Sequence, residues 1–570
     1  MQRSLLALAV ASLALAGCSK EDAPPPAAEA PAVSHVAPPP VTDHSFGPEI
    51  SAEDFAAHVQ TLASDEFEGR APGGPGERKT IEYIQGHFER LGLQPGNGDS
   101  WLQAVPMVET TAAPDTALTL HLGDEARALV FGKEMVIGTR TGQPEIVLDR
   151  SELVFVGYGV HAPELGWNDY EGLDVKGKTV VMFVNDPGFH TGDESLFEGR
   201  RMTYYGRWTY KFEEAARQGA TGALIVHDDA GAGYGWGVVE NGWTGPQFDL
   251  PTSVDPEPRL PLQGWITQEV AQALFAHAGL DLRAQYQAAT QRGFKSVPLN
   301  AAISTTLRSS TREAVSNNVL GLLPGRTRPD EVVIYMAHWD HLGRSFGGVG
   351  DRIFNGAVDN ATGVAGILEI AEMFATQPAP ERSVLFLAVT LEESGLLGSK
   401  YYASNPVIPL HKTVATINID AIQPIGPTRD FVVVGKGSSE LEDILAPIAA
   451  AQGRVLVEES QPEVGMYFRS DHFNFAKAGV PSLYAKGGVD HREHGREYGM
   501  ELVRDYTANR YHKPGDHFDP NWDLRGIIED LDALYQVGRE LVTSDRWPEW
   551  YEGNPFRAAR EASMRDAGAN

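Results

Sequence analysis

The sequence predicts an α/β protein in which a mixed, mostly parallel sheet flanked by helices is interrupted by an inserted β-rich domain. From residue 316 onward, apolar stretches of strand length alternate with helical stretches, which is typical of a sheet covered by helices on both faces. Between about residues 145 and 300, the pattern changes to short strands and loops. A chain of 570 residues is also too long for a single hydrophobic core. More than one domain is therefore expected.

The first residues are typical of an exported lipoprotein. Arg3 precedes a small-residue apolar run over residues 5–16, which is shorter than the ~20 residues that a membrane-spanning helix needs. The run ends in Leu-Ala-Gly-Cys18, which resembles the lipobox of bacterial lipoproteins, where the cysteine becomes the acylated first residue. We therefore expect residues 1–18 to be a lipoprotein signal peptide. The alternative is an ordinary secretory signal with an incidental cysteine.

The cysteine count, the next residues and the net charge narrow the class of protein. Cys18 is the only cysteine, which excludes disulfides and a cysteine nucleophile from the folded part. Ser19 follows it, where lipoproteins retained in the inner membrane often have Asp, so a Gram-negative source would imply an outer-membrane anchor facing the periplasm or the exterior. Residues 19–45 are rich in Pro and Ala and predict an extended tether. The net charge of −30 argues against nucleic acid as a partner.

Residues 50–92 predict two helices joined by a glycine-rich loop. Ser51 begins a capping box at the start of the first helix, and Gly92 stands where a glycine ends the second. The loop EFEGRAPGGPGERKT lacks P-loop spacing. We interpret this loop as a plain connection.

The stretch from 145 to 300 resembles the protease-associated domain that is inserted in several exopeptidases. Its segment WTYKFEEAARQGATGALIVHD predicts an amphipathic helix followed by a strand. Several acidic and histidine residues in it lack the spacing of metal ligands, so they are interpreted as solvated loop residues: Asp186, His190, His227, Asp228 and Asp229.

Five short segments farther along carry histidines and carboxylates, and four of them lie at or just past predicted strand ends. Ligands bind at the carboxyl ends of strands in open α/β sheets, and imidazole and carboxylate groups suit Zn²⁺. The segments are His338-Trp-Asp340, Gly356-Ala-Val-Asp359-Asn-Ala-Thr-Gly363, Glu392-Glu393-Ser-Gly395, Asn418-Ile-Asp420 and Tyr511-His512-Lys-Pro514.

In this order, the five segments resemble the co-catalytic dizinc exopeptidases, the family of bacterial leucyl aminopeptidases, aminopeptidase Y and glutamate carboxypeptidase II. The resemblance covers roughly residues 316–545 and implies the zinc exopeptidase fold. It implies that 301–570 is the zinc peptidase domain, that 46–144 is its N-terminal part, and that 145–300 is the inserted protease-associated domain.

The resemblance also implies two zinc ions per chain. His338 and Asp420 would hold one ion, Glu393 and His512 would hold the other, and Asp359 would bridge both. Two cations ~3.5–4 Å apart can acidify a shared water and polarise the scissile carbonyl, which is the chemistry of peptide hydrolysis.

Two more residues of these segments have implied roles that do not involve metal binding. Asp340 would be the carboxylate that orients His338. Glu392 would be the general base that takes a proton from the zinc-bound water and passes it to the leaving amine. His341 has no counterpart in the family and is treated as structural.

Two further segments keep alternative interpretations. Asp471 and His472 could line the pocket or form a hydrogen-bonded pair in the core. His517 competes with His512 as a ligand, but only His512 stands in the Tyr-His-x-Pro frame.

The function implied by the resemblance is a zinc-dependent exopeptidase acting on peptides, an aminopeptidase first. A carboxypeptidase of the same fold is the nearer alternative and would need cations for a free carboxylate, which the sequence cannot assign among Arg344, Arg469 and Arg492. A glutaminyl cyclase with one zinc and a non-catalytic binding lipoprotein are more distant alternatives.

Replacing Cys18 with Ser is expected to give an active protein that no longer binds membranes. The lipid, and not the fold, would hold the chain at the membrane. Detergent partitioning of both forms measures this, and a variant that stays with the membrane would contradict the lipobox interpretation.

Overall fold

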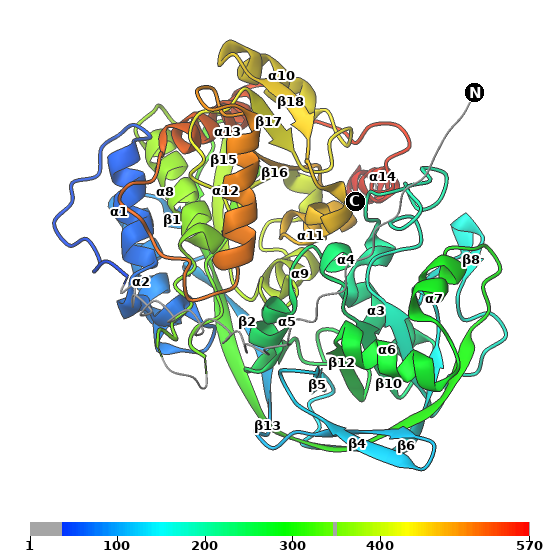
Figure 1. Ribbon diagram of the computed structural model, residues 1–570. Helices are drawn as coiled ribbons and strands as arrows, with labels where there is room; N and C mark the ends of the chain where they lie inside the picture. Colours follow the sequence, from blue (N-terminus) through cyan, green and yellow to red (C-terminus); the bar gives the residue numbers. More distant parts are fainter. Residues whose placement is uncertain (1–36, 346–349, 569–570) are drawn as a thin grey trace, which may run out of the picture. The chain divides into compact units, whose positions relative to one another are not determined.

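The computed structural model describes residues 37–345 and 350–568 (Figure 1). The predicted signal peptide, with Cys18, and most of the predicted tether lie outside the described residues. Within the described ranges, no helix is both long and apolar enough to cross a membrane.

The central sheet contains four parallel strands and a mixed edge. Strands β14 (Arg328–His338), β15 (Arg382–Val389), β16 (Thr413–Asn418) and β19 (Ser482–Gly487) pair in parallel in the order β15–β14–β16–β19. Antiparallel neighbours flank them: β13 (Val297–Leu323) pairs with β15, and β17 (Asp430–Val433) pairs with β19. The predicted mixed, mostly parallel sheet is confirmed.

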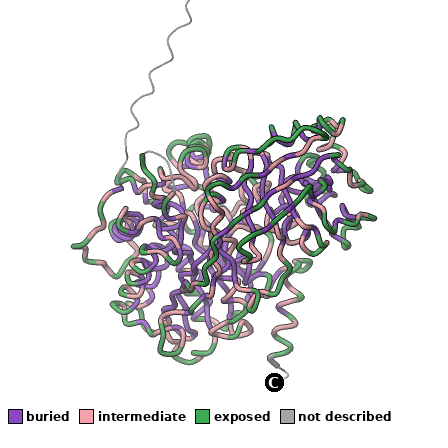
Figure 2. The backbone as a smooth tube through the Cα atoms, turned by 90° about the horizontal axis from the view of Figure 1, so that it is seen from below, coloured by how far each residue is buried: buried purple, intermediate pink, exposed green. Residues whose placement is uncertain are grey.

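Helices cover both faces of this sheet. Side chains on a strand point alternately to opposite sides, so neighbouring residues of one strand pack on different faces. On β14, Val333 and Tyr335 belong to one hydrophobic cluster, whereas Ile334 and Met336 belong to another. The first cluster includes residues of five helices: α1 (Ala52–Leu62), α2 (Pro75–Arg90), α8 (Thr362–Ala375), α10 (Leu441–Ala451) and α13 (Arg525–Thr543). The second includes residues of α9 (Leu397–Ser404) and α11 (His472–Lys477). Figure 2 shows the buried backbone gathered in the interior.

The two helices expected within residues 50–92 are present as α1 and α2. The Ser51 side chain accepts a hydrogen bond from the backbone N–H of Asp54 at 3.0 Å, which caps α1. Gly92 follows the end of α2 with φ +71°, a left-handed conformation that glycine adopts without strain.

A second group of strands has hydrophobic clusters of its own, and all their buried members lie between Leu118 and Leu307. Parallel strands β6 (Glu145–Phe155), β9 (Thr179–Phe183), β10 (Gly222–Val226) and β12 (Leu262–Ile266) form its centre, with β5 (Met135–Gly138) antiparallel to β12. The assignment of 145–300 as a protease-associated domain, with those boundaries, stays a prediction.

Strand β13 connects the two groups of strands (Figure 1). Its first part pairs with β6 and with β3 (Leu118–Leu122), and its later part pairs with β2 (Leu102–Ala112) and β15. The short strand β11 (Gln247–Asp249) also pairs with β2. These pairings hold residues 145–300, called the inserted segment after that prediction, beside the carboxyl ends of the central strands.

Candidate metal centre

Three central strands deliver the predicted ligands to one edge of the sheet. His338 is the last residue of β14, and Asp420 follows the end of β16 by two residues. Glu392 and Glu393 follow the end of β15. Because these strands are parallel, their carboxyl ends meet at the same edge.

Asp359 and His512 reach this edge from other elements. Asp359 lies in the turn just before α8, and His512 lies in the loop after α12 (Arg496–Asn509). His512 has a left-handed backbone with φ +54°. The structure therefore brings together all five residues predicted as metal ligands.

Asp359 faces a different histidine with each of its oxygens. Its Oδ1 lies 3.4 Å from Nε2 of His338, and its Oδ2 lies 3.2 Å from Nε2 of His512. His338 Nε2 is also 3.4 Å from Asp420 Oδ1, and His512 Nε2 is 3.1 Å from Glu393 Oε2. The five side chains thus form two groups that share one carboxylate.

His341, which the sequence analysis treated as structural, lies against the second group. Its Nδ1 is 2.5 Å from Glu393 Oε1, and its ring centroid is 5.7 Å from that of His512. One atom each from His341, Asp359 and Glu393 lie within 4.8 Å of one another. A second imidazole three residues after His338 was the available sequence signal.

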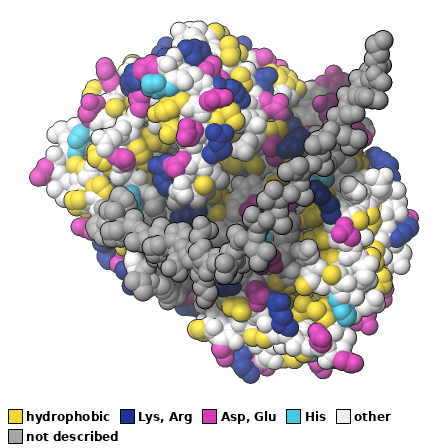
Figure 3. Space-filling view, in the orientation of Figure 1, with side chains coloured by type: hydrophobic (Ala, Val, Ile, Leu, Met, Phe, Trp, Pro, Cys, Tyr) yellow, Lys and Arg dark blue, Asp and Glu magenta, His cyan; other side chains and the backbone are white. Residues whose placement is uncertain are grey.

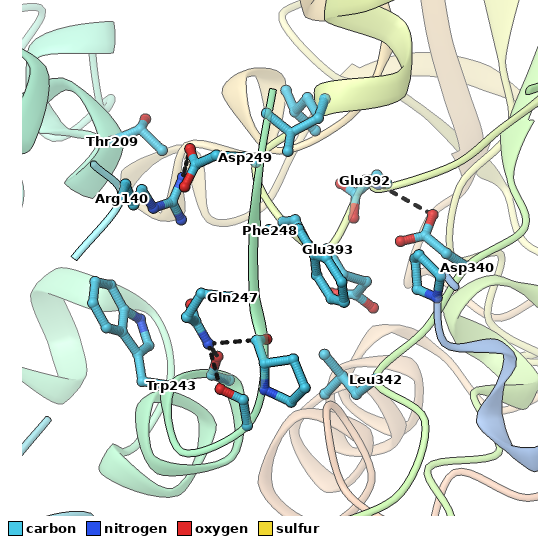
Figure 4. Close-up of a pocket in the computed structure, with 18 of the residues that line it drawn as sticks. Arg140, Thr209, Trp243, Gln247, Phe248, Asp249, Asp340, Leu342, Glu392 and Glu393 are labelled. Carbon is cyan, nitrogen blue, oxygen red and sulfur yellow. Dashed lines mark hydrogen bonds and ion pairs between the residues drawn. The ribbon is translucent and has the colours of Figure 1, made fainter. Parts of the chain in front are cut away.

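Asp340 contacts the site in a way that the sequence did not predict. Its backbone carbonyl lies 3.1 Å from Nδ1 of His338, whereas its carboxylate Oδ1 is 3.9 Å from that nitrogen. The same Oδ1 accepts a hydrogen bond from the backbone N–H of Glu392 at 3.1 Å (Figure 4). Burial raises the pKa of the Asp340 carboxyl to about 8. Through the hydrogen bond from the Glu392 N–H, the Asp340 side chain fixes the backbone of Glu392.

The two imidazoles that face Asp359, those of His338 and His512, have shifted pKa values. Burial lowers the pKa of His512, but the charges of Glu393 and Asp359 outweigh it and raise that pKa to about 10. The pKa of His338 is raised in the same way, since Glu392 and two aspartates outweigh its burial. Both imidazoles therefore lie in a strongly negative environment.

The two adjacent glutamates differ. Burial raises the pKa of Glu392 well above its usual range, and the charges of Glu393 and Asp420 raise it further. For Glu393, the effect of burial is outweighed by His512 and His341, and its pKa falls to about 2. Glu393 is thus a carboxylate ready to bind a cation, whereas Glu392 can hold a proton.

Neighbouring groups hold the ligand segments in place. The backbone N–H groups of Val358 and Asp359 donate to the buried Asp516 carboxylate at 3.2 and 3.1 Å. The Asn241 side chain, from the inserted segment, donates to the His512 carbonyl at 3.0 Å. Imidazole nitrogens and carboxylate oxygens are the donors that zinc takes in proteins, so this buried, supported set fits Zn²⁺.

Asp471, His472 and His517 had alternative interpretations from the sequence, and the structure shows what each of them contacts. His472 is fully buried, its ring packs against Tyr467 and Tyr484, and burial lowers its pKa to about 3. Among the described residues, the Asp471 carboxylate and the His472 ring form no hydrogen bond with each other, so they are not a hydrogen-bonded pair. His517 contacts Asp351 at 3.0 Å, whereas His512 faces Glu393.

A cleft of ≈ 1050 Å³ opens onto the metal centre. Figure 4 shows Glu392, Glu393 and Asp340 on one side and inserted-segment residues, among them Trp243 and Gln247, on the other. Figure 3 shows acidic side chains interspersed with basic ones over the face in view. Because Trp243 and Gln247 line the cleft, the inserted segment forms one wall of the cavity in which a substrate would bind.

Comparison with known families finds one matching family. Residues 318–535 match the description of peptidase family M28. This range is somewhat over a third of the chain and is similar to that family. The matched range contains all five predicted ligands and both Asp340 and Glu392, as the resemblance in the sequence implied.

Three curated relatives are named aminopeptidases. Mouse aminopeptidase NAALADL1 is 32% identical over 22% of this chain and 16% of its own length. The probable leucine aminopeptidase 2 of Aspergillus oryzae is 32% identical over 28% and 34%. The probable lipoprotein aminopeptidase LpqL of Mycobacterium tuberculosis is 24% identical over 43% and 50%. The chain thus spans half or less of the length of these relatives.

A solved structure shares the fold over most of the chain. The aminopeptidase from Aneurinibacillus sp. strain AM-1 has a TM-score of 0.50 and 20% identity, covering 88% of this chain and 95% of that one. The predicted zinc exopeptidase fold is confirmed.

Proposed function

We propose that the protein is a zinc-dependent exopeptidase, an aminopeptidase that removes N-terminal residues from peptides, with two zinc ions per chain. The observation that carries the proposal is the division of Asp359 between His338 on one oxygen and His512 on the other. A carboxylate placed in this way is suited to bridge two cations.

The residues that would hold the ions follow from the two groups. His338 and Asp420 would hold one zinc, Glu393 and His512 the other, and Asp359 both. When bound, such a pair acidifies water and polarises the scissile carbonyl. The second group of ligands supports hydrolysis over the one-zinc glutaminyl cyclase considered from the sequence.

Glu392 would supply the proton transfers. It borders the cleft, and its Oε2 lies 4.0 Å from Nε2 of His338. Its pKa is raised by burial, and a cation in the site would bring that pKa back toward neutrality. A carboxylate of that kind can accept a proton from water and deliver it to the leaving amine. The Asp340 carboxylate positions Glu392 through its backbone N–H.

Export and lipid anchoring through Cys18 are part of the proposal. They rest on the lipobox-like residues Leu15 to Cys18. That one relative is named a lipoprotein aminopeptidase agrees with this location.

The two neighbouring glutamates should respond differently to substitution. Glu393→Ala should lower the zinc content, because it opens one coordination position. Glu392→Gln should keep both zinc ions and reduce kcat by ~10²–10⁴-fold with little change in KM, because it removes only the proton acceptor. Zinc analysis and steady-state kinetics on an amino-acid p-nitroanilide measure both. Loss of zinc from Glu392→Gln alone would reverse the roles, and no effect from either variant would refute the dizinc site.

Two arginines in the cleft favour substrates with a free carboxylate near the scissile bond. Arg469 borders the cleft, as does Arg207 from the inserted segment, which is only 8% exposed. Burial and the neighbouring charge of Arg469 lower the pKa of Arg207 to about 10. Across the described ranges, neither arginine forms an ion pair, and Nε of both is buried without a hydrogen-bond partner; Nη2 of Arg469 donates to the Ala232 carbonyl at 2.5 Å.

The other arginines considered from the sequence are placed differently. Arg344 borders the cleft 3.9 Å from Glu68, and Arg492 forms an ion pair with Glu529 at 2.8 Å. The unpaired arginines therefore support the second candidate function, the cleavage of short peptides whose terminal carboxylate lies next to the cleaved bond.

Arg207→Met should raise KM for dipeptides with a free carboxylate by about tenfold or more, since hydrogen bonds to charged groups contribute about 1.5–3 kcal/mol. Dipeptide amides and p-nitroanilides should be affected little. Arg217→Met is the matched control, because Arg217 borders the same cleft but pairs with Glu214 at 2.9 Å. Equal effects on acids and amides would exclude a carboxylate subsite, and amidated peptides with Glu in second place would reveal side-chain recognition.

A further inference from the structure

The glycine-rich loop between α1 and α2, interpreted from the sequence as a plain connection, packs directly on the metal centre. The backbone N–H of His341 donates to the carbonyl of Arg70 at 3.3 Å, and that of Gly343 donates to the carbonyl of Gly69 at 2.9 Å. A Cβ at Gly69 would lie 2.3 Å from the carbonyl oxygen of Gly343. The loop therefore approaches the segment after β14 more closely than a side chain would allow.

The Arg70 guanidinium donates to four backbone carbonyls. Its Nε donates to Trp339 at 2.9 Å, and its Nη2 donates to Gly356 at 2.8 Å. Its Nη1 donates to Asn355 at 2.5 Å and to Leu62 at 2.9 Å. A planar guanidinium fixes the directions of its donors, so these acceptors are held in one arrangement.

The acceptors lie in the two segments that carry the central ligands. Trp339 is the residue between His338 and Asp340, and Gly356 precedes Asp359 by three residues. One rigid side chain thus links the strand end that carries His338 to the turn that carries the shared carboxylate.

The positive charge of Arg70 lies near several buried carboxylates of the candidate metal centre. The residue is 1% exposed, and among the described residues its guanidinium donates to carbonyls and forms no ion pair with a carboxylate. Burial lowers its pKa to about 10, and the nearby charges of Asp359, Asp516 and Asp340 oppose that effect. At neutral pH the group stays charged. A buried cation without a paired carboxylate is costly, and here it offsets the charge of the clustered carboxylates.

We propose that Arg70 is a positioning residue of the metal centre, which sets the separation of the His338 and Asp359 segments and thereby the affinity for zinc. The proposal rests on the proposed function, because it assumes that these residues bind zinc. Arg70 touches neither ligand side chains nor substrate, and it acts through the backbone of the two segments.

The test compares Arg70→Lys with Arg382→Lys. Arg382 is a control because it is fully buried and donates to the carbonyls of Leu541 and Arg546 at 2.6 and 2.7 Å, away from the metal centre; unlike Arg70 it also pairs with Glu331 at 2.5 Å. Both substitutions should lower the melting temperature of the metal-free protein. Only Arg70→Lys should weaken zinc binding, by about 10–100-fold, the range found when groups that support metal ligands are lost. Chelator competition measures this affinity without any peptide substrate.

Other results of this comparison would overturn either the role of Arg70 or the proposed function. If both variants lose thermal stability and both bind zinc like the unchanged protein, Arg70 is only structural and the proposal is overturned. If the unchanged protein binds no zinc, the proposed function itself fails. If Arg70→Lys does not fold, Gly69→Ala serves instead, because its Cβ displaces the loop and keeps the guanidinium. Unchanged zinc affinity in that variant would also overturn the proposal.

Discussion

A single carboxylate shared by two histidines determines the arrangement of the site. Asp359 directs Oδ1 toward His338 and Oδ2 toward His512, so each histidine must approach from its own side. Asp420 then completes the first group and Glu393 the second. The parallel strands make this possible, because their carboxyl ends bring residues from distant parts of the chain to one edge.

The cost of this arrangement is the burial of several like charges. The charge of Glu393 raises the pKa of both Glu392 and Asp340. Burying charges is unfavourable unless they are paired or bind metal. The facing imidazoles, the Arg70 guanidinium and two divalent cations would together balance the carboxylates. The local charge therefore agrees with the chemistry proposed for the site.

The sequence predicted features that depend on local pattern. Alternating apolar stretches predicted the sheet and its helices, and the ligand motifs could be recognised because each is a short local pattern, three of them directly after a strand. It did not predict contacts between distant backbones. Arg70 and Trp339 are 269 residues apart, and nothing in the loop sequence indicates a guanidinium bound to carbonyls at the metal centre. The position of the Asp340 carboxylate on the Glu392 backbone depends likewise on the turn after β15.

Diffraction at the zinc absorption edge, on crystals of the protein loaded with zinc, tests the central claim most directly. The account predicts two anomalous peaks ~3.5–4 Å apart, with the Asp359 carboxylate between them. His338 and Asp420 should lie at one peak, and Glu393 and His512 at the other. A single peak at full zinc occupancy, or a second ion bound away from Asp359, would contradict the shared-carboxylate site.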